Sequence, residues 1–393
     1  MKPQNDPPCF RFRRISATFA CACFMIAADA SALSCNDKPN RYRERDIFSS
    51  LQESPNVQYG QNKNPLFNNQ TINLLADIYE PAGDTCAKRP LVIFMWGGGF
   101  QTGTRKDESG TCRQFAKRGF VSAAIDYRMG VNGVQGAENF ATPAFMSTQD
   151  TRAAVRFFRK NATRYRIDTS LIYVGGCSSG AYAAMWTGYL DKLQEIPSEV
   201  RKDAQDGGIE GSSGNPGFSS RFAGVLSLSG AVHDTNWINT GDVPMAMVQC
   251  AADPTVHPEG GIGAGSKLQY YGATAVAARA AHVNVPKTLL TYAGACHCPR
   301  PIGPNGLDST VDFFAKSAYG FMIAPASTRI EAALFPGDYR MPIDGGTAYD
   351  LSGAEIRSGV EVRVEAGFRN GAAYRRGSRP GSFKPGIHFR KNP

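Results

Sequence analysis

Short apolar runs alternate with longer amphipathic segments along most of this 393-residue chain, from Thr71 to about Ile323. Strands separated by crossover helices produce this alternation, and such strands lie parallel in one sheet. Two of the runs, 91–95 and 171–174, are apolar at every position, as burial between two helix layers requires. The sequence therefore predicts an α/β fold with a mostly parallel central sheet and helices on both faces.

We expect strands at 71–79, 91–96, 121–126, 171–175, 222–228, 245–250 and 288–292, and helices at 114–118, 148–165, 179–193 and 267–282. Asp150 is expected to cap the second helix or to pack inside as a polar residue. Between these elements, 197–220 is rich in Gly, Ser, Asp and Pro, which predicts a surface excursion. A long loop of this kind either borders a cleft or is a plain surface insertion.

The first residues have the order of a secretory signal. Basic side chains precede an uncharged apolar run at 15–28, and small residues follow at Ala28, Ala30 and Ala32. The run is short for a membrane span, and the A-x-A arrangement suits a signal peptidase. We therefore expect residues 1–32 to be removed on export, leaving a secreted or cell-surface protein without a transmembrane segment. A buried N-terminal helix is the alternative.

The length of the chain accommodates one catalytic domain, expected at 36–322, and a small appendage. Short strands and turns predict a β-rich domain at 327–393. Its segments 349–353 and 385–389 resemble the C-terminal sorting domains of secreted proteins from some Gram-negative bacteria. The usual asparagine-proline opening of those domains is replaced here by Phe335-Pro336-Gly337-Asp338. The resemblance implies contact with the secretion machinery.

The net charge of +9 is concentrated at the two ends of the chain. Residues 1–30 have four basic and two acidic side chains, and residues 366–393 have seven basic and no acidic ones. The part between them has 32 basic and 32 acidic residues. Because that body has no net charge, we do not expect nucleic-acid binding. The basic tail is either solvated or in contact with anionic surface polymers.

The segment Gly176-Cys177-Ser178-Ser179-Gly180 fits the pattern G-x-S-x-G between an expected strand and an expected helix. A serine on such a sharp turn exposes its Oγ, and the flanking glycines avoid clashes with neighbouring backbone. The first amides of the following helix point at developing negative charge. Ser178 is therefore the candidate nucleophile and the Ser179 amide a candidate oxyanion donor. A tight glycine turn without catalysis is the alternative.

A second glycine-rich segment, Trp96-Gly97-Gly98-Gly99-Phe100, follows an early expected strand. Backbone N–H groups of consecutive glycines can converge on one oxygen without obstruction by side chains. We expect Gly98 and Gly99 to complete the oxyanion hole, although a flexible loop at the strand end is the alternative. Lipases and esterases usually begin this segment with His. Trp96 stands there instead, so another group must brace the loop.

A serine nucleophile needs a base within hydrogen-bond reach. Among the five histidines, His297 follows the last expected strand, which matches the chain order serine, acid, histidine of α/β-hydrolases. Asp253, in the loop after the strand expected at 245–250, is the candidate that orients the imidazole. Asp234 is the rival acid, and a turn-forming role is the alternative for Asp253. Surface or cleft positions are expected for the other histidines, His233, His257, His282 and His388.

Residues 74–299 resemble the carboxylesterase and lipase-like α/β-hydrolases, on the strength of 96–100, 126–128, 150–161, 176–180, 253–256 and His297. The resemblance implies hydrolysis of an ester through an acyl-enzyme without a cofactor. A peptidase on the same fold and a non-catalytic binding protein are the alternatives. The chain shows no large gating insertion, which argues against the peptidase, and its triad is intact, which argues against the binding protein.

Three of the ten cysteines leave with the expected signal, and the other seven then lie in an oxidising compartment. Cys177 directly precedes Ser178, and Cys298 directly follows His297. This arrangement is similar to the paired cysteines of tannase and feruloyl-esterase enzymes, and it implies a Cys177–Cys298 bridge. Together with secretion, the similarity favours esters on plant or microbial polysaccharide, such as acetyl or feruloyl groups.

The other cysteines have more than one possible arrangement. We expect a bridge between Cys86 and Cys112 near the first crossover, and Cys250 can pair with Cys296, which leaves Cys35 alone. A buried or free thiol is the alternative for each. The spacing in Cys296-His297-Cys298 is too tight for a C-x-x-C metal site, and the chain has neither a phosphate-binding GK[ST] loop nor an NAD-type glycine fingerprint. No metal or cofactor is expected.

Overall fold

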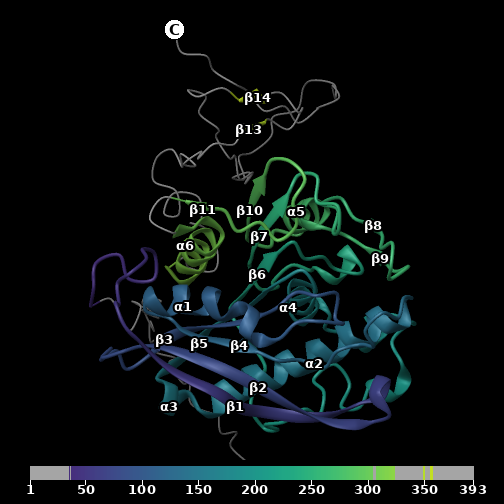
Figure 1. Cartoon of the computed structure of the whole chain (residues 1–393), viewed down its shortest axis with the longest axis horizontal. Helices are drawn as coiled ribbons and strands as arrows, with labels where there is room; N and C mark the ends of the chain where they lie inside the picture. The colour runs from purple at the N-terminus through teal and green to yellow at the C-terminus, as the bar shows by residue number, and fades with distance from the viewer. Residues whose placement is uncertain (1–34, 36, 304–306, 324–347, 350–354, 357–393) are drawn as a thin grey trace, which may run out of the picture.

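The central sheet of the molecule has eight strands (Figure 1). The computed structural model describes residues 35, 37–303, 307–323, 348–349 and 355–356. In spatial order the strands are β1 (Leu51–Asn64), β2 (Gln70–Pro81), β4 (Val121–Ile125), β3 (Arg89–Met95), β5 (Ile167–Cys177), β6 (Gly224–Leu228), β7 (Met245–Cys250) and β10 (Lys287–Tyr292). The pairs β1–β2 and β2–β4 are antiparallel, and all later neighbours in the sheet are parallel. The predicted mostly parallel sheet is confirmed.

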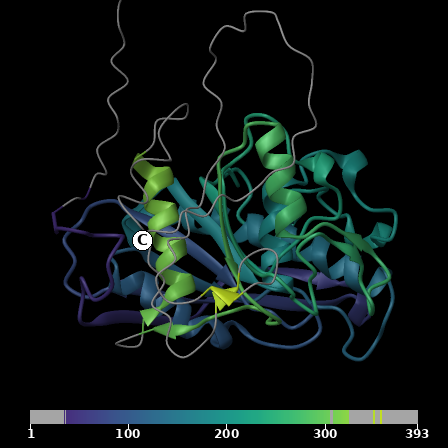
Figure 2. The same cartoon turned by 90° about the horizontal axis from the view of Figure 1, so that it is seen from above.

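Helices cover both faces of this sheet, as predicted. One core contains α2 (Glu138–Lys160), α4 (Ser179–Tyr189) and α5 (Ala273–His282), and the other contains α1 (Ser109–Lys117) and α6 (Ser309–Ile323). Figure 2 shows α5 and α6 standing well apart. Successive residues of β3 enter opposite cores, since Ile93 packs with α2 and α4 while Val92 and Phe94 pack with α1 and α6. This is the period of two that a strand buried on both faces must have.

The remaining elements are short. They are α3 (Ala162–Tyr165), the 3-10 helices η1 (Pro65–Phe67), η2 (Arg105–Glu108), η3 (Leu193–Glu195), η4 (Lys202–Ala204) and η5 (Thr235–Trp237), and the two-stranded pairs β8 (Gly261–Ile262) with β9 (Gln269–Tyr270), β11 (Ile302–Gly303) with β12 (Leu307–Asp308), and β13 (Ala348–Tyr349) with β14 (Glu355–Ile356). Of these, η2 matters most below, because it leads from the glycine-rich loop into α1.

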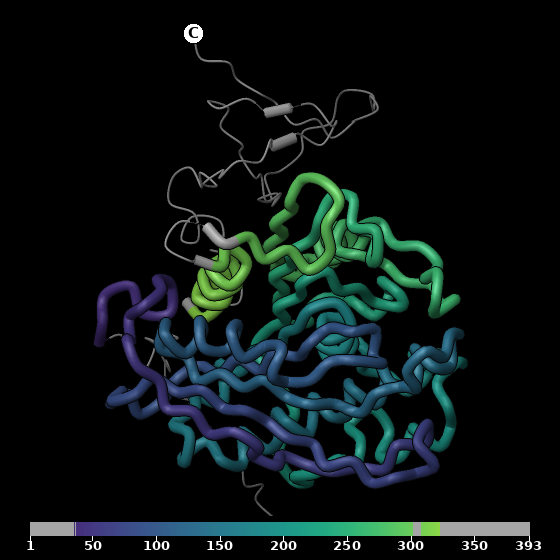
Figure 3. The backbone as a smooth tube through the Cα atoms, in the orientation of Figure 1, coloured from purple at the N-terminus to yellow at the C-terminus, as the bar shows by residue number. Residues whose placement is uncertain are grey.

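Sequence analysis did not predict β1, which forms a long hairpin with β2 along one edge of the sheet (Figure 3). Only Tyr59 and Asn64 of this strand are buried. An edge strand is stabilised by backbone pairing with its neighbour, so it needs no apolar run. The alternation used to find the other strands is therefore absent from it.

Several helix boundaries also differ from the prediction, most of all the starts of α2 and α5. Helix α2 begins at Glu138, well before the expected 148, so Asp150 lies inside the helix and does not cap it. Helix α5 begins at Ala273, because Gln269–Tyr270 form β9 and Tyr271 pairs with Val232. Helix α6 was not predicted.

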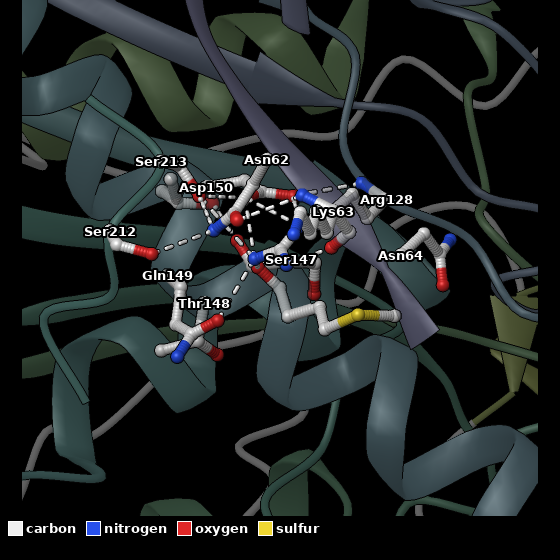
Figure 4. A network of polar contacts seen from close by, with 12 residues as sticks. Asn62, Lys63, Asn64, Arg128, Ser147, Thr148, Gln149, Asp150, Ser212 and Ser213 are labelled. Carbon is white, nitrogen blue, oxygen red and sulfur yellow. Dashed lines mark hydrogen bonds and ion pairs between the residues drawn. The ribbon is translucent and has the colours of Figure 1, made fainter. Parts of the chain in front are cut away.

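Segment 197–220 packs on α2 and β1 (Figure 4). Ser213 Oγ donates to Asp150 Oδ1 at 2.6 Å, and Arg128 Nε lies 3.0 Å from both oxygens of that carboxylate. Gln149 Nε2 donates to the Gly208 carbonyl at 2.7 Å. None of these side chains lines the cleft beside Ser178. The segment is therefore a surface insertion tied to a buried ion pair, and it does not border that cleft.

The expected signal at 1–32 lies outside the described residues. So does the expected domain at 327–393, apart from β13 and β14, which pair antiparallel. Within the described part of the chain, no helix combines the length and the apolar character that a membrane span needs.

Candidate active site

Ser178 lies between the end of β5 and the start of α4, with φ 52° and ψ −119°. Residues other than glycine rarely adopt a positive φ, and a serine that does so between a strand and a helix has the geometry of a nucleophile elbow. The turn needs glycine on both sides. A Cβ on Gly176 would lie 2.4 Å from the Gly180 carbonyl carbon, and one on Gly180 would lie 2.3 Å from the Met95 oxygen. Close backbone contact therefore fixes the direction of the serine.

The three residues proposed from sequence as a triad lie in one hydrogen-bonded chain. His297 Nε2 is 2.9 Å from Ser178 Oγ, and His297 Nδ1 is 2.8 Å from Asp253 Oδ2. They follow β5, β7 and β10, which point the same way in the sheet. Because the carboxyl ends of parallel strands lie at one edge, residues distant in sequence meet there.

Asp253 is fully buried and accepts hydrogen bonds from four donor groups. Besides His297, the amides of Thr255 and Val256 donate to Oδ1 at 2.9 and 3.0 Å, and Gln249 Nε2 donates to Oδ2 at 2.9 Å. Burial raises the pKa of Asp253 more than any other single effect. The hydrogen bonds from His297, Val256 and Thr255, together with the charge interaction with His297, outweigh burial, so the pKa of Asp253 lies below its ordinary value. The carboxylate is held ionised against the imidazole.

We expect Asp253 to make the free energy of unfolding depend on pH in the acid range. Its pKa is lower in the folded chain than in the unfolded chain, where it is about 3.9. The stabilisation is complete above about pH 4 and is lost as the pH falls through the lower folded value. Urea unfolding between about pH 5 and pH 2.5 should show a steeper loss of stability for the wild type than for Asp253→Asn. Equal slopes would contradict the assigned ionisation.

The rival acid and the other described histidines lie outside this hydrogen-bonded chain. Asp234, the rival acid, accepts the Asn236 amide at the start of η5. His233 Nδ1 lies 3.0 Å from the Gln269 carbonyl, and His257 accepts from the amide of Glu259. His282 is exposed at the end of α5. His388 lies outside the described residues.

The loop expected to form the oxyanion hole passes directly over the elbow. A Cβ on Gly97 would come within 3.0 Å of the Ser178 Cβ, and Gly98 and Gly99 have φ of 137° and 62°. Gly97, Gly98 and Gly99 line the same cleft as Ser178. Ser179 opens α4, so its amide has no partner within the helix. Gly98 and Gly99 therefore line one cleft with Ser178, and Ser179 follows Ser178 directly, so the three predicted donors lie in the segments next to the serine.

Tyr127 braces this loop in place of the missing histidine. Its ring stacks on Trp96 with centroids 4.2 Å apart, and its hydroxyl donates to the Trp96 carbonyl at 2.9 Å. The same hydroxyl lies 3.3 Å from Ser179 Oγ. Burial raises the pKa of Tyr127, so it stays a neutral donor. Sequence analysis did not assign Tyr127 this role.

Gln249 was missed as well. It is a polar residue inside the buried strand Met245–Cys250, and that placement is the signal that could have identified it. Buried polar groups need partners. Its amide donates to both Asp253 Oδ2 and the Val256 carbonyl, so it links the strand to the acid loop.

Two disulfides hold the loop that contains His297. The structure joins Cys177 to Cys298, with 6.0 Å between their Cα atoms, and Cys250 to Cys296, with 5.5 Å. These bridges connect the histidine loop to the strand before Ser178 and to the strand before Asp253. The segments that contain Ser178, Asp253 and His297 are thus tied together covalently.

The predicted Cys86–Cys112 bridge is wrong. Cys86 pairs with Cys35, and Cys112 is a free, buried thiol. Cys112 lies on the inner face of α1, where it packs in the core with Phe115. Proximity along the chain therefore misled the prediction, because the helix turns Cys112 away from Cys86 and into the apolar layer.

One group of four side chains, Cys35, Asp37, Asp84 and Cys86, has the composition of a metal site, with ligand atoms within 4.8 Å of one another. The two cysteines are joined as a disulfide, and Arg41 forms ion pairs with both carboxylates. The sulfur and carboxylate atoms that could bind a metal therefore already have partners, and we assign no metal to this group.

Removing the Cys177–Cys298 bridge is expected to lower stability and activity together. The bridge closes a separation of 121 residues, for which the chain-entropy relation gives about 5 kcal/mol of stability. The histidine loop then loses its link to the elbow, and a displacement of about 1 Å reduces kcat by about 100-fold. The Cys177→Ala/Cys298→Ala double variant should show both effects in urea unfolding and in ester hydrolysis.

The matched control is the double variant Cys35→Ala/Cys86→Ala, whose bridge spans 51 residues away from the cleft. It should lose about 4 kcal/mol of stability, while the folded enzyme keeps its kcat. If both double variants reduced kcat equally, the Cys177–Cys298 bridge would have no special role at the site.

The cleft beside Ser178 has a volume of about 480 Å³ and one strongly polar wall. Asp107, Glu108 and Arg300 form that wall. Arg300 Nη2 donates to Glu108 Oε1 at 2.7 Å. Burial raises the pKa of Glu108, and the Arg300 guanidinium offsets part of this effect. Sequence analysis did not find this pair, because no local pattern connects residues so far apart in the chain.

The sheet order, the elbow at Ser178 and the helices on both faces define the α/β-hydrolase fold. The fold is similar to that of a truncated carbohydrate esterase from gut microbiota, with a TM-score of 0.51 and 19% identity over 70% of this chain and 99% of that one. Within this class, residues 76–211 match the BD-FAE family.

Curated relatives match over shorter stretches. A probable isoprenylcysteine alpha-carbonyl methylesterase of Oryza sativa is 31% identical over 140 residues, which are 36% of this chain and 28% of that protein. The juvenile hormone esterase of Heliothis virescens is 27% identical over 100 residues, 25% of this chain and 18% of that protein. The chain thus spans less than a third of the length of either relative.

Proposed function

We propose that this chain is a serine carboxylic-ester hydrolase. The observation that carries the proposal is the continuous contact from Asp253 through His297 to Ser178, with the serine on a strained elbow. The match to BD-FAE and the relatives named as esterases support it.

In the proposed reaction, His297 Nε2 takes the proton of Ser178 Oγ as that oxygen attacks the ester carbonyl carbon. The amides of Gly98, Gly99 and Ser179 stabilise the oxyanion of the tetrahedral intermediate. The intermediate collapses, and the alcohol leaves with the proton from the imidazole. Water then attacks the acyl-enzyme with the same base, which releases the carboxylic acid and restores Ser178. Asp253 stabilises the imidazolium in both halves of the reaction.

The proposed substrates are acetyl or feruloyl esters of polysaccharides, and the proposed place of action is outside the cell. The expected signal at 1–32, the arrangement of Cys177 and Cys298 around the triad, and the match to BD-FAE support this. We further propose that the basic region at 366–393 lies in a domain that contacts the secretion machinery.

A fluorophosphonate probe tests the proposed nucleophile. It should label the purified protein at Ser178, as located by peptide mass spectrometry, and Ser178→Ala should remove the label. A panel of p-nitrophenyl esters and chromogenic peptides then separates an esterase from a peptidase. Labelling that persists in Ser178→Ala would overturn the nucleophile, and a labelled protein that cleaves only peptides would overturn the reaction class.

A further inference from the structure

The polar wall of the cleft, formed by Asp107, Glu108 and Arg300, is not needed for the reaction proposed above. Asp107 and Glu108 belong to η2, directly after the glycine-rich loop, and Arg300 follows His297 in its loop. The wall thus joins the two segments that flank Ser178. Because it is charged, it is a poor surface for an apolar acyl group.

Arg300 is held rigidly but remains accessible. Its Nη2 donates to both oxygens of Glu108, at 2.7 and 2.8 Å, and its Nη1 donates to Thr111 Oγ1. The Glu108 side chain is 4% exposed, whereas that of Arg300 is 27% exposed. A guanidinium has five N–H donors. Among the described residues these bonds involve Nη1 and Nη2 only, so the Nε N–H of this cleft-lining side chain is left to donate to a bound molecule.

Asp107 supplies the complementary acceptor. It is exposed, and its Oδ2 accepts the Thr104 amide at 2.8 Å, so the carboxylate is held at the mouth of the cleft. The charge of Arg300 is already balanced by Glu108, and the buried Asp308 is a further carboxylate nearby. A negatively charged ligand therefore meets an unfavourable potential, while a hydroxyl group finds both a donor and an acceptor.

We propose that Arg300 and Asp107 determine specificity by binding hydroxyl groups on the alcohol part of a neutral, hydroxyl-rich ester. One hydroxyl oxygen accepts an N–H of Arg300, and a hydroxyl proton is donated to Asp107. Glu108 is a positioning residue for Arg300. This inference rests on the proposed function. It adds that esters with a carboxylate on their alcohol part are poorer substrates than neutral ones.

The test compares three acetyl esters: p-nitrophenyl acetate, an acetylated methyl xyloside and an acetylated methyl glucuronoside. The variants are Arg300→Lys, which keeps the ion pair with Glu108 but loses the planar fork, and Asp107→Asn, which keeps an acceptor for Thr104. The matched controls are Arg201→Lys and Asp203→Asn, an exposed ion pair that does not line the cleft. Thermal unfolding verifies that each variant is folded.

For the wild type we expect kcat/KM to be higher for the xyloside than for the glucuronoside. Arg300→Lys should lower kcat/KM for the xyloside by about tenfold more than for p-nitrophenyl acetate, mainly through KM. Asp107→Asn should lower the preference for the xyloside over the glucuronoside several-fold. The two control variants should show the same preference as the wild type.

An equal loss on the xyloside and on p-nitrophenyl acetate would show that Arg300 only positions the histidine loop, and the inference would fall. Equal use of the two sugar esters by the wild type would also overturn it. In both cases hydrolysis of p-nitrophenyl acetate and labelling of Ser178 would leave the proposed function standing. If the wild type hydrolysed none of the three and took no label, the proposed function would fail and the inference with it.

Discussion

Ser178→Ala is expected to reduce kcat for p-nitrophenyl acetate by about 10⁶-fold, down to the background of the assay. The methyl group cannot attack the carbonyl, and no other hydroxyl is bonded to His297 Nε2 in the described residues. Alanine has no Oγ but keeps the same backbone, so the fold should persist. Steady-state kinetics with circular dichroism as a check of folding measure the effect.

A matched control for this variant lies on β5, the strand that precedes Ser178. Ser170 is exposed near the start of β5, where its hydroxyl bonds Asp168. Ser170→Ala should keep kcat within about twofold, because surface substitutions rarely exceed about 0.5 kcal/mol. Activity of Ser178→Ala within tenfold of the wild type would contradict the proposed nucleophile.

Asp253→Asn is expected to lower kcat by about 10⁴-fold while the chain stays folded. The site is built for a carboxylate, since Gln249 Nε2 and the amides of Thr255 and Val256 all donate to its oxygens. The side-chain NH₂ group of an asparagine would face N–H donors in place of one carboxylate oxygen. An NH₂ group facing His297 Nδ1 would favour the tautomer that carries its proton on Nε2. The imidazole then cannot accept the serine proton.

The rival acid provides the control for this second prediction. Asp234→Asn should keep the activity, since asparagine also caps a helix start and the Asp234 side chain accepts the Asn236 amide at η5. Loss of activity in Asp234→Asn combined with retention in Asp253→Asn would reverse the assignment. Measuring kcat and KM for both variants on one ester decides the matter.

Prediction from sequence worked where the signal is local. The strand at Met245–Cys250 was found at its full length because every residue in it is buried. The elbow at Ser178 was recognisable because a strand, a serine with glycines close on both sides, and a helix follow one another directly along the chain. The order of strands along the chain then placed Asp253 and His297 after the correct strands.

Prediction failed where the partner of a residue is distant in sequence. The edge strand β1 has no apolar run, and it exists because β2 supplies its hydrogen bonds. Cys86 pairs with Cys35 because the fold brings them to 5.6 Å between Cα atoms, while the nearer Cys112 is turned into the core. The brace from Tyr127 to Trp96 likewise depends on two strands lying side by side.

By itself, the sequence determined the α/β class and the mostly parallel sheet, and it singled out Ser178, Asp253 and His297, which the fold places in one hydrogen-bonded chain. Hydrophobic period and turn chemistry are properties of neighbouring residues, so a sequence can reveal them. Only the tertiary structure decided which cysteines pair, what braces the glycine-rich loop and which charges face the cleft. These features depend on distances between segments that are separated by up to 192 residues, as Glu108 and Arg300 are. Such distances result from packing of the whole chain, and no short stretch of sequence encodes them.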